Sequence, residues 1–337
     1  MSQVAEMGEP LLSTILVTGG TGYVGSQLIR DLALDEHFAG SVIRIFDNMQ
    51  RGNYQALMNL PEAGRFQFIE GDILDPATIQ RALQGVGAVV HLAAIVSTPF
   101  SFDHPAWTEQ VNHWGTTHLV EQCLEANVTR FVFASSSSVY GPGGIFSEAD
   151  PCHPIGPYAQ SKWHAEQAVL AAAQRGLCPT SLRLATVFGT AAAMRFDAVA
   201  NRFAYLAGIG RPLTIYGTGR QTRPFVHVSD ASSAIRFCLA HTEQTSSETF
   251  NVIGENASIL KLVDAVREIK LDVQVRYTEQ DVLTHFAYGI QGDKFEALGW
   301  QPQYTIEYAL AEIIAHFRNL GPLPNTTPLD NSHFIES

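Results

Sequence analysis

The sequence predicts an α/β fold in which a doubly wound parallel sheet is followed by a smaller mixed α/β lobe. Three observations support this prediction. Short apolar and β-branched runs alternate with longer helical patterns through the first half of the chain. Several runs, such as the one at 88–92, are apolar almost throughout, which indicates strands buried on both faces. A glycine-rich turn follows the first run directly.

The predicted elements follow one another in a regular order. We expect strands at 14–18, 42–46, 66–70, 88–92, 130–134 and 180–185, with helices between them as parallel crossovers. Later helices are expected at 197–207, 230–240, 258–269 and 305–318. After residue 186 the regular alternation of strands and helices gives way to mixed short strands and helices. We therefore expect a tail at 1–13, a nucleotide-binding domain at 14–186, a substrate-binding lobe at 187–321 and a flexible tail at 322–337, with the chain free to cross between the lobes.

Composition excludes several classes of protein. Hydrophobic residues make up 46% of the chain and charged residues 16%, which is typical of a compact globule. The net charge of -12 provides no broad positive surface for nucleic acid or anionic lipid. The four cysteines have no metal-site spacing, no apolar run reaches the ~18 residues of a membrane span, and the N-terminus lacks a signal-peptide core. We expect a cytoplasmic protein that binds neither nucleic acid nor membrane.

The glycine-rich turn is the first candidate site. Residues 19–25 read Gly-Gly-Thr-Gly-Tyr-Val-Gly and contain the frame Gly20-x-Gly22-x-x-Gly25. In a strand-turn-helix unit, such glycines let a pyrophosphate approach the backbone amides and the positive end of the helix. The second strand leads to Asp47, a carboxylate suited to the adenosine ribose hydroxyls. Asp47 favours NAD over NADP, although Arg51 is placed to reach a 2′-phosphate. A purely structural turn is the alternative.

A second candidate site is chemical. Tyr158 and Lys162 lie four residues apart at the start of a helical run, so both face one side and the ammonium favours the phenolate. The fifth strand ends in four serines, 135–138, which places hydroxyls at the carboxyl end of a strand where ligands bind. Alone, a Tyr/Lys pair on a helix usually consists of exposed residues without a catalytic role. Together with the upstream turn, it predicts an enzyme.

These motifs occur in the order typical of one family. Together with Gly71-Asp72, a Val139-Tyr140-Gly141 triplet and Leu298-Gly299-Trp300, they make the sequence resemble the extended short-chain dehydrogenases/reductases of the NAD-dependent sugar-nucleotide epimerase/dehydratase type. The resemblance covers about residues 14–318 and implies a Rossmann-type fold with NAD as cofactor. The implied cofactor contacts are Gly19, Gly22, Tyr23, Val24, Gly25, Asp47, Asn48, Asp72, Ile73, Leu92, Ala93, Ala94, Tyr158 and Lys162.

The resemblance also implies catalytic roles. Tyr158 is the acid/base, Lys162 holds the nicotinamide ribose and lowers the pKa of Tyr158, and Ser136 hydrogen-bonds the reacting sugar oxygen. Tyr158 would remove a hydroxyl proton while the carbon gives hydride to the nicotinamide. An epimerase, a dehydratase and a reductase all share this step.

Two departures from the family pattern narrow the reaction. The family's 4,6-dehydratases have Asp-Glu after the serine equivalent to Ser136, whereas this chain has Ser137-Ser138. Elimination of water then lacks its acid and base. The 3,5-epimerising branch carries a cysteine where this chain has Ser138. C4 epimerisation of a nucleotide sugar is the leading interpretation. A ketoreductase or dehydrogenase acting on a deoxysugar or another secondary alcohol is the alternative, followed by a dehydratase and a non-catalytic dinucleotide-binding protein.

The implied substrate pocket is less complete. Its candidate residues are Ser137, Ser138, Thr186, Arg195, Asn201 and Arg223. Gly289 stands where one branch has a phosphate-binding arginine, which suggests a smaller or differently activated substrate. Of the twelve histidines, those at 91, 104, 113, 118, 153, 164 and 227 show no HExxH motif or paired spacing, so no metal is expected. Helices expected at 107–126 and 161–174 carry apolar stripes that either belong to the core or pair across a dimer, as is common in the family, and we favour a homodimer.

Overall fold

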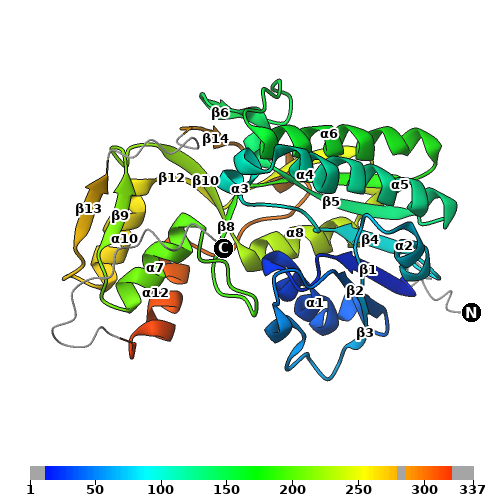
Figure 1. Ribbon diagram of the computed structural model, residues 1–337, viewed down its shortest axis with the longest axis horizontal. Helices are drawn as coiled ribbons and strands as arrows, with labels where there is room; N and C mark the ends of the chain where they lie inside the picture. The colour runs from blue at the N-terminus through cyan, green and yellow to red at the C-terminus, as the bar shows by residue number, and fades with distance from the viewer. Residues whose placement is uncertain (1–11, 279–285, 321–337) are drawn as a thin grey trace, which may run out of the picture.

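The structure, a computed structural model, describes residues 12–278 and 286–320 of the chain. Of the two predicted tails, residues 1–11 and 322–337 lie outside the described residues. Figure 1 shows two lobes side by side, one around the strands β1 to β5 and the other around β9, β10, β12 and β13. The predicted doubly wound sheet with a second, smaller lobe is confirmed.

The first lobe is built on a seven-stranded parallel sheet with the strand order β11-β7-β5-β4-β1-β2-β3. All six predicted strands are present, with ends that differ from the prediction by two residues at most. The strands are β1 (Thr14–Thr18), β2 (Val42–Asp47), β3 (Arg65–Glu70), β4 (Ala88–His91), β5 (Arg130–Ser136), β7 (Cys178–Leu184) and β11 (Glu248–Val252).

Burial of the central strands explains their sequences. Every residue of β1 and β4 is buried, whereas the edge strand β3 is exposed along much of its length. Ile15 and Val17 of β1 face one core and Leu16 between them faces the other. Alternate residues of one strand therefore pack against the helix layers on opposite faces of the sheet.

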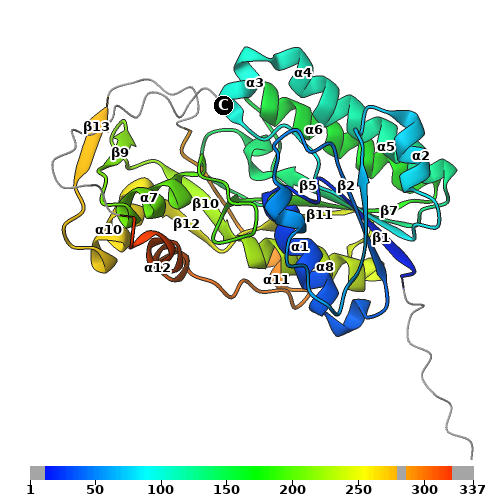
Figure 2. The same cartoon turned by 60° about the horizontal axis from the view of Figure 1, so that its bottom comes forward.

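Helices cover both faces of this sheet. One layer consists of α1 (Tyr23–Leu34) packed on α8 (Val228–Ala240), and Figure 2 shows the two side by side. The other layer contains α2 (Pro76–Ala82), α3 (Thr98–Asp103), α4 (Pro105–Glu109), α5 (Gly115–Glu125) and α6 (Pro157–Ala171). Among the described residues, no helix is long and apolar enough to span a bilayer.

The second lobe has its own apolar core. Its strands are β8 (Thr186–Phe188), β10 (Thr222–His227) and β12 (Glu255–Ser258) in one sheet, with β9 (Leu213–Tyr216) paired to β13 (Val275–Thr278). Its helices are α7 (Val199–Gly208), α10 (Ile259–Ile269) and α12 (Ile306–Phe317), close to the predicted ranges. The chain crosses back to the first lobe between these elements, since α8 and β11 lie with the central sheet. Two short strands, β6 (Ile145–Phe146) and β14 (Gly289–Ile290), pair with each other.

One helix differs from its prediction. The continuous helix predicted for 107–126 is interrupted by a π-helical turn, Gln110–Trp114, between α4 and α5. The side chain of Asn112 is buried there, and it donates to the Ile95 carbonyl and accepts from the Ile95 N–H. These contacts hold the turn to the chain beyond β4, and the apolar pattern along the helix does not reveal them.

Candidate active site

The glycine turn lies against the loop that follows β4. Gly19 has φ +69°, and a Cβ atom there would lie 2.6 Å from the backbone nitrogen of Ala93. A Cβ atom on Gly25 would lie 2.3 Å from the Gly19 carbonyl oxygen. Neither position accepts a larger residue without movement of the backbone. The two loops therefore form one surface at the carboxyl edge of the sheet, with Leu92, Ala93 and Ala94 partly buried behind the turn.

The N-terminus of α1 is open to an anion. Gly22 is its N-cap, no side chain of the described residues caps it, and its first turn carries no acidic residue. The first N–H groups of a helix lack intrahelical partners and form its positive end. The backbone at Tyr23, Val24 and Gly25 is thus suited to a pyrophosphate.

Carboxylates gather at the ends of the neighbouring strands. Asp47 Oδ2 accepts from the Thr21 N–H and Oδ1 from the Met49 N–H, each over 3.0 Å. Asn48 donates to Asp72 over 2.9 Å, which ties the end of β2 to the segment after β3. Ile73, predicted as a cofactor contact, is buried. An acidic rim beside an anion-binding turn has the donor and acceptor pattern of an NAD site, so the residues present fit this cofactor.

The hydroxyl groups of the second predicted site come together. Ser136 ends β5 and Tyr158 lies in the first turn of α6. The Ser136 hydroxyl lies 2.9 Å from the Ser138 Oγ and close enough to the Tyr158 phenol to influence its pKa. Burial raises the pKa of Tyr158, while the Ser136 hydrogen bond and the positive charge of Arg195 act in the opposite direction. The phenol is therefore a neutral proton donor unless a nearby cation stabilises its anion.

Lys162 is buried one helical turn beyond Tyr158. Its Nζ donates to the Ala134 carbonyl over 2.6 Å and lies 4.6 Å from the centre of the Phe133 ring. Burial lowers the pKa of Lys162 to about 7, and the nearby Glu166 opposes that change. The effect of burial is larger than that of Glu166, so Lys162 loses its proton as the pH rises through the neutral range.

A pocket opens beside the Tyr158 phenol. It encloses about 50 Å³, well below the ~300 Å³ of an ordinary small-molecule site, so the lining side chains must move apart to admit a large ligand. It is lined by Thr98, Phe102, Ser138, Gly141, Ile155, Tyr158, Ala159, Arg223, Phe286 and Tyr288. None of these residues is acidic, so the described lining provides one cation and several hydroxyls.

Tyr288 is a pocket residue that the sequence analysis did not predict. Its hydroxyl lies 3.0 Å from the Ser137 Oγ, and the Arg223 guanidinium lies 5.5 Å from the centre of its ring. The next residue, Gly289, is buried, and a Cβ atom there would lie 2.7 Å from Asn256 Oδ1. Asn256 in turn hydrogen-bonds the backbone of Ile290. An arginine side chain at position 289 would clash with Asn256 unless Asn256 gave up its hydrogen bonds to Ile290 in β14.

The other predicted substrate residues differ in burial and in their hydrogen-bond partners. Thr186 begins β8 and is partly buried. Arg195 forms an ion pair with Asp197, with 2.7 Å between Nε and Oδ1, and also donates to the Val96 carbonyl. Asn201 is fully buried, and its amide bonds the backbone of Gly189 and Arg195 and the Tyr23 hydroxyl. The Asn201 side chain therefore joins protein segments and is not directed into the pocket.

The chain is similar to known proteins over most of its length. The model of the NAD dependent epimerase/dehydratase family matches residues 15–252. A Bacillus subtilis protein described as the uncharacterized UDP-glucose epimerase YtcB is 34% identical over 326 residues, which cover 91% of this chain and 98% of that protein.

Two solved structures are also similar. DesIV, a dTDP-glucose 4,6-dehydratase from Streptomyces venezuelae with NAD and TYD bound, has a TM-score of 0.81 at 27% identity, over 91% of this chain and 97% of its own. A UDP-glucose 4-epimerase from Thermotoga maritima, with UDP-glucose, has a TM-score of 0.81 at 28% identity, over 91% and 99%. The chain therefore belongs to the NAD dependent epimerase/dehydratase family, and its cofactor is NAD.

Proposed function

We propose that the protein interconverts C4 epimers of a nucleotide-activated hexose through a transient 4-keto sugar. The observation that carries this proposal is the composition of the pocket beside Tyr158, whose described lining has hydroxyls and Arg223 but no carboxylate. Elimination of water requires an acid and a base at the sugar. The dehydratases of the family have Asp-Glu for these roles, and this chain has Ser137 and Ser138 at the same positions. The similarity to a UDP-glucose 4-epimerase supports the same reaction.

Each side chain has a defined task in this proposal. Tyr158 removes the proton of the sugar hydroxyl and later returns it, and Ser136, which lies beside the phenol, orients the reacting oxygen. NAD, held at the glycine turn and beside Asp47, would supply the acceptor and donor of hydride for the sugar carbon. Lys162, one turn further along α6, donates to the Ala134 carbonyl, and in its protonated form it would favour the phenolate electrostatically. Arg223 supplies the cation that a nucleotide diphosphate requires.

A specific observation favours the second candidate, a ketoreductase or dehydrogenase acting on a smaller secondary alcohol. Gly289 is packed against Asn256, so this position supplies no second cation to a diphosphate. A charge-assisted hydrogen bond contributes about 1.5–3 kcal/mol, so its loss would weaken a sugar nucleotide considerably.

One experiment distinguishes the two functions. The purified protein is incubated with catalytic NAD and a panel of UDP-, dTDP- and GDP-hexoses, and NADH absorbance is followed together with product mass and stereochemistry. Epimerisation predicts an isomer of unchanged mass without accumulation of NADH. Oxidation that consumes stoichiometric NAD, or no reaction with any sugar nucleotide, would favour the dehydrogenase or ketoreductase instead. A product lighter by one water would identify a dehydratase.

The proposal includes a cytoplasmic homodimer. Trp107 and Trp114 are 43% and 61% exposed on the helical layer formed by α4, α5 and α6, which is the region with the apolar stripes. Large exposed aromatic side chains are common at protein interfaces. All four cysteines are free thiols, as in a reducing compartment. Light scattering is expected to give the mass of two chains, and Trp107→Glu is expected to give one. A monomeric wild-type protein would contradict the dimer.

A further inference from the structure

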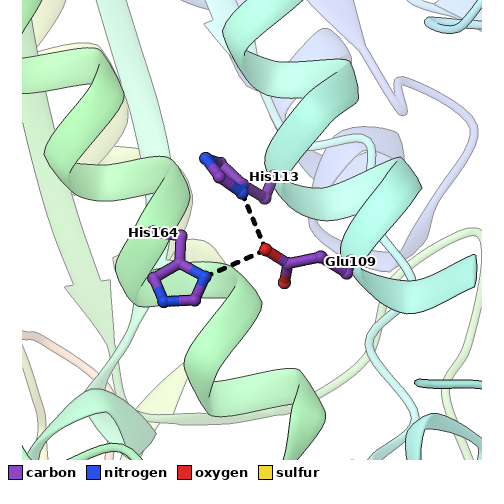
Figure 3. Close-up of side chains that lie close together, drawn as sticks. All are labelled: Glu109, His113 and His164. Atoms are coloured by element: carbon purple, nitrogen blue, oxygen red, sulfur yellow. Dashed lines mark hydrogen bonds and ion pairs between the residues drawn. The ribbon is translucent and has the colours of Figure 1, made fainter. Parts of the chain in front are cut away.

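Three side chains outside the Tyr158 pocket converge on one point of the surface. Figure 3 shows Glu109 between His113 and His164, with both histidines directed at the same carboxylate oxygen. Glu109 Oε1 lies 2.7 Å from His113 Nδ1 and 2.9 Å from His164 Nδ1. One nitrogen or oxygen atom from each residue lies within 4.8 Å of the other two.

The backbone presents these side chains from two elements. Glu109 ends α4 and His113 lies four residues later in the π-helical turn, so both lie on one face of the chain. His164 comes from α6, in the middle of the helix that also carries Tyr158 and Lys162. A π-helical turn inside an α-helix is rare and often occurs at functional sites.

The framework beneath the three side chains is fixed. Asn112 is buried in the π-helical turn and donates to Ser161 Oγ over 3.0 Å. Ser161 is in α6, three residues before His164, so this hydrogen bond sets the separation of the two elements. The Trp114 ring stacks on the His113 imidazole, with centroids 4.9 Å apart and planes inclined by 30°. Packing and hydrogen bonds of this kind hold ligand side chains in position.

The donor set has the chemistry of a transition-metal site. Two imidazole nitrogens and one carboxylate oxygen are the ligands of many zinc centres that keep a fourth position for water. Ligands about 2.1 Å from a tetrahedral ion are separated by about 3.4 Å, so a small widening of the observed cluster admits the ion. In a single chain, the side chains of His113, Glu109 and His164 are 21%, 33% and 48% exposed, which leaves them accessible to a hydrated ion before two chains associate. Calcium and magnesium prefer all-oxygen ligands.

We propose that Glu109, His113 and His164 bind a divalent transition-metal ion of the zinc class, separate from the catalytic pocket. The ion would take the place of the bridging hydrogen bonds and fasten α6 to the π-helical turn. No metal was expected from the sequence, because its histidines show no paired spacing along the chain. Here the second histidine lies 55 residues after Glu109, and only the fold brings it close.

Cobalt is the probe for this site because its visible absorption reports the ligand set. Full-length protein is freed of metal with a chelator and titrated with Co²⁺, then with Zn²⁺ as a competitor, while thermal unfolding is measured with and without Zn²⁺. We expect one Co²⁺ per chain at micromolar concentration with the intense visible bands of a tetrahedral site. Zn²⁺ should displace these bands and raise the unfolding temperature, since a ligand that binds only the folded state stabilises it.

Matched variants assign the site to these residues. Glu109→Gln, His113→Gln and His164→Gln should each weaken Co²⁺ binding about 10-fold or more and reduce the thermal shift. His316→Gln is the control, because Glu312 and His316 repeat the four-residue spacing on α12. It should bind as the wild type does. His164 is the most exposed of the three ligands, so its variant tests the proposal even where another variant folds poorly. No binding to the wild type at millimolar Co²⁺, or wild-type affinity in His164→Gln, would overturn the proposal.

Discussion

The Tyr23 hydroxyl donates a hydrogen bond to the Gly189 carbonyl over 2.5 Å, across 166 residues of sequence. The same hydroxyl accepts from Asn201 Nδ2 over 3.1 Å, and Asn201 Oδ1 accepts from the Gly189 N–H over 2.9 Å. Burial raises the pKa of Tyr23 far above its usual range, so the phenol remains a neutral donor. Tyr23 is the first residue of α1. This closed set of bonds therefore connects the pyrophosphate-binding turn to the chain beyond β8.

Tyr23→Phe is expected to destabilise the fold and to weaken ligand binding together. The variant leaves the Gly189 carbonyl without its donor, and an unsatisfied buried polar group costs about 1–3 kcal/mol. Urea unfolding should show a loss of this size, and the Kd for NAD should rise. Tyr54→Phe, at a tyrosine that is 65% exposed, is the control and should change neither quantity. An unchanged NAD affinity in Tyr23→Phe would mean that the hydrogen bonds do not couple the two segments.

Tyr158→Phe should abolish turnover and preserve cofactor binding. The phenylalanine keeps the packing but cannot exchange a proton with the sugar hydroxyl, and loss of a general acid/base typically lowers the rate about 10²–10⁴-fold. The measurement is kcat for the substrate found in the panel, beside the Kd for NAD from fluorescence titration. Tyr277→Phe, at an exposed tyrosine, should retain full activity. Near-normal turnover of Tyr158→Phe would contradict the assigned mechanism.

Asp47 is expected to determine the preference for NAD. Asp47→Ala should weaken NAD binding and reduce the discrimination against NADP, because the carboxylate that repels a 2′-phosphate is gone. The alanine also removes the acceptor for the Thr21 and Met49 N–H groups. Asp47→Asn is therefore the matched variant, since it removes the charge and keeps one acceptor oxygen. The ratio of Kd for NADP to Kd for NAD should fall in both variants. An unchanged ratio in both would remove Asp47 from the cofactor site.

The sequence predicted the sheet well because its strands are locally distinctive. β1 and β4 are buried along their whole length, and their apolar runs end at the glycine turn and at His91. The partners of Tyr23 and Ser137 were not predictable, because Gly189 and Tyr288 reach them only through the fold. The predicted substrate residue Asn201 instead bonds Gly189, Arg195 and Tyr23, and no local sequence pattern indicates these contacts.

His91 shows how a strand residue beside the site makes stability depend on pH. It ends β4 with no exposed surface, and its ring nitrogens lie 2.6 Å from Thr18 Oγ1 and 2.8 Å from Thr116 Oγ1. Burial, and to a lesser degree the charge of Lys162, lowers the pKa of His91 to about 3. The histidine is therefore neutral in the folded protein over the physiological pH range.

Acidification is expected to weaken the fold through this residue. An unfolded histidine has a pKa of about 6.5, so below that pH His91 is protonated in the unfolded chain but remains neutral in the folded protein. The stabilisation is complete above pH ~6.5 and is lost as the pH falls towards ~3. At pH 5 the loss from His91 amounts to about 2 kcal/mol. Urea unfolding of the wild type at pH 7 and pH 5 measures it. His91→Gln, which retains hydrogen-bonding capacity without titrating, should lose about 2 kcal/mol less than the wild type, whereas exposed His37→Gln should follow the wild type. Equal losses in the wild type and His91→Gln would show that His91 titrates normally in the fold, against the burial that the structure gives it.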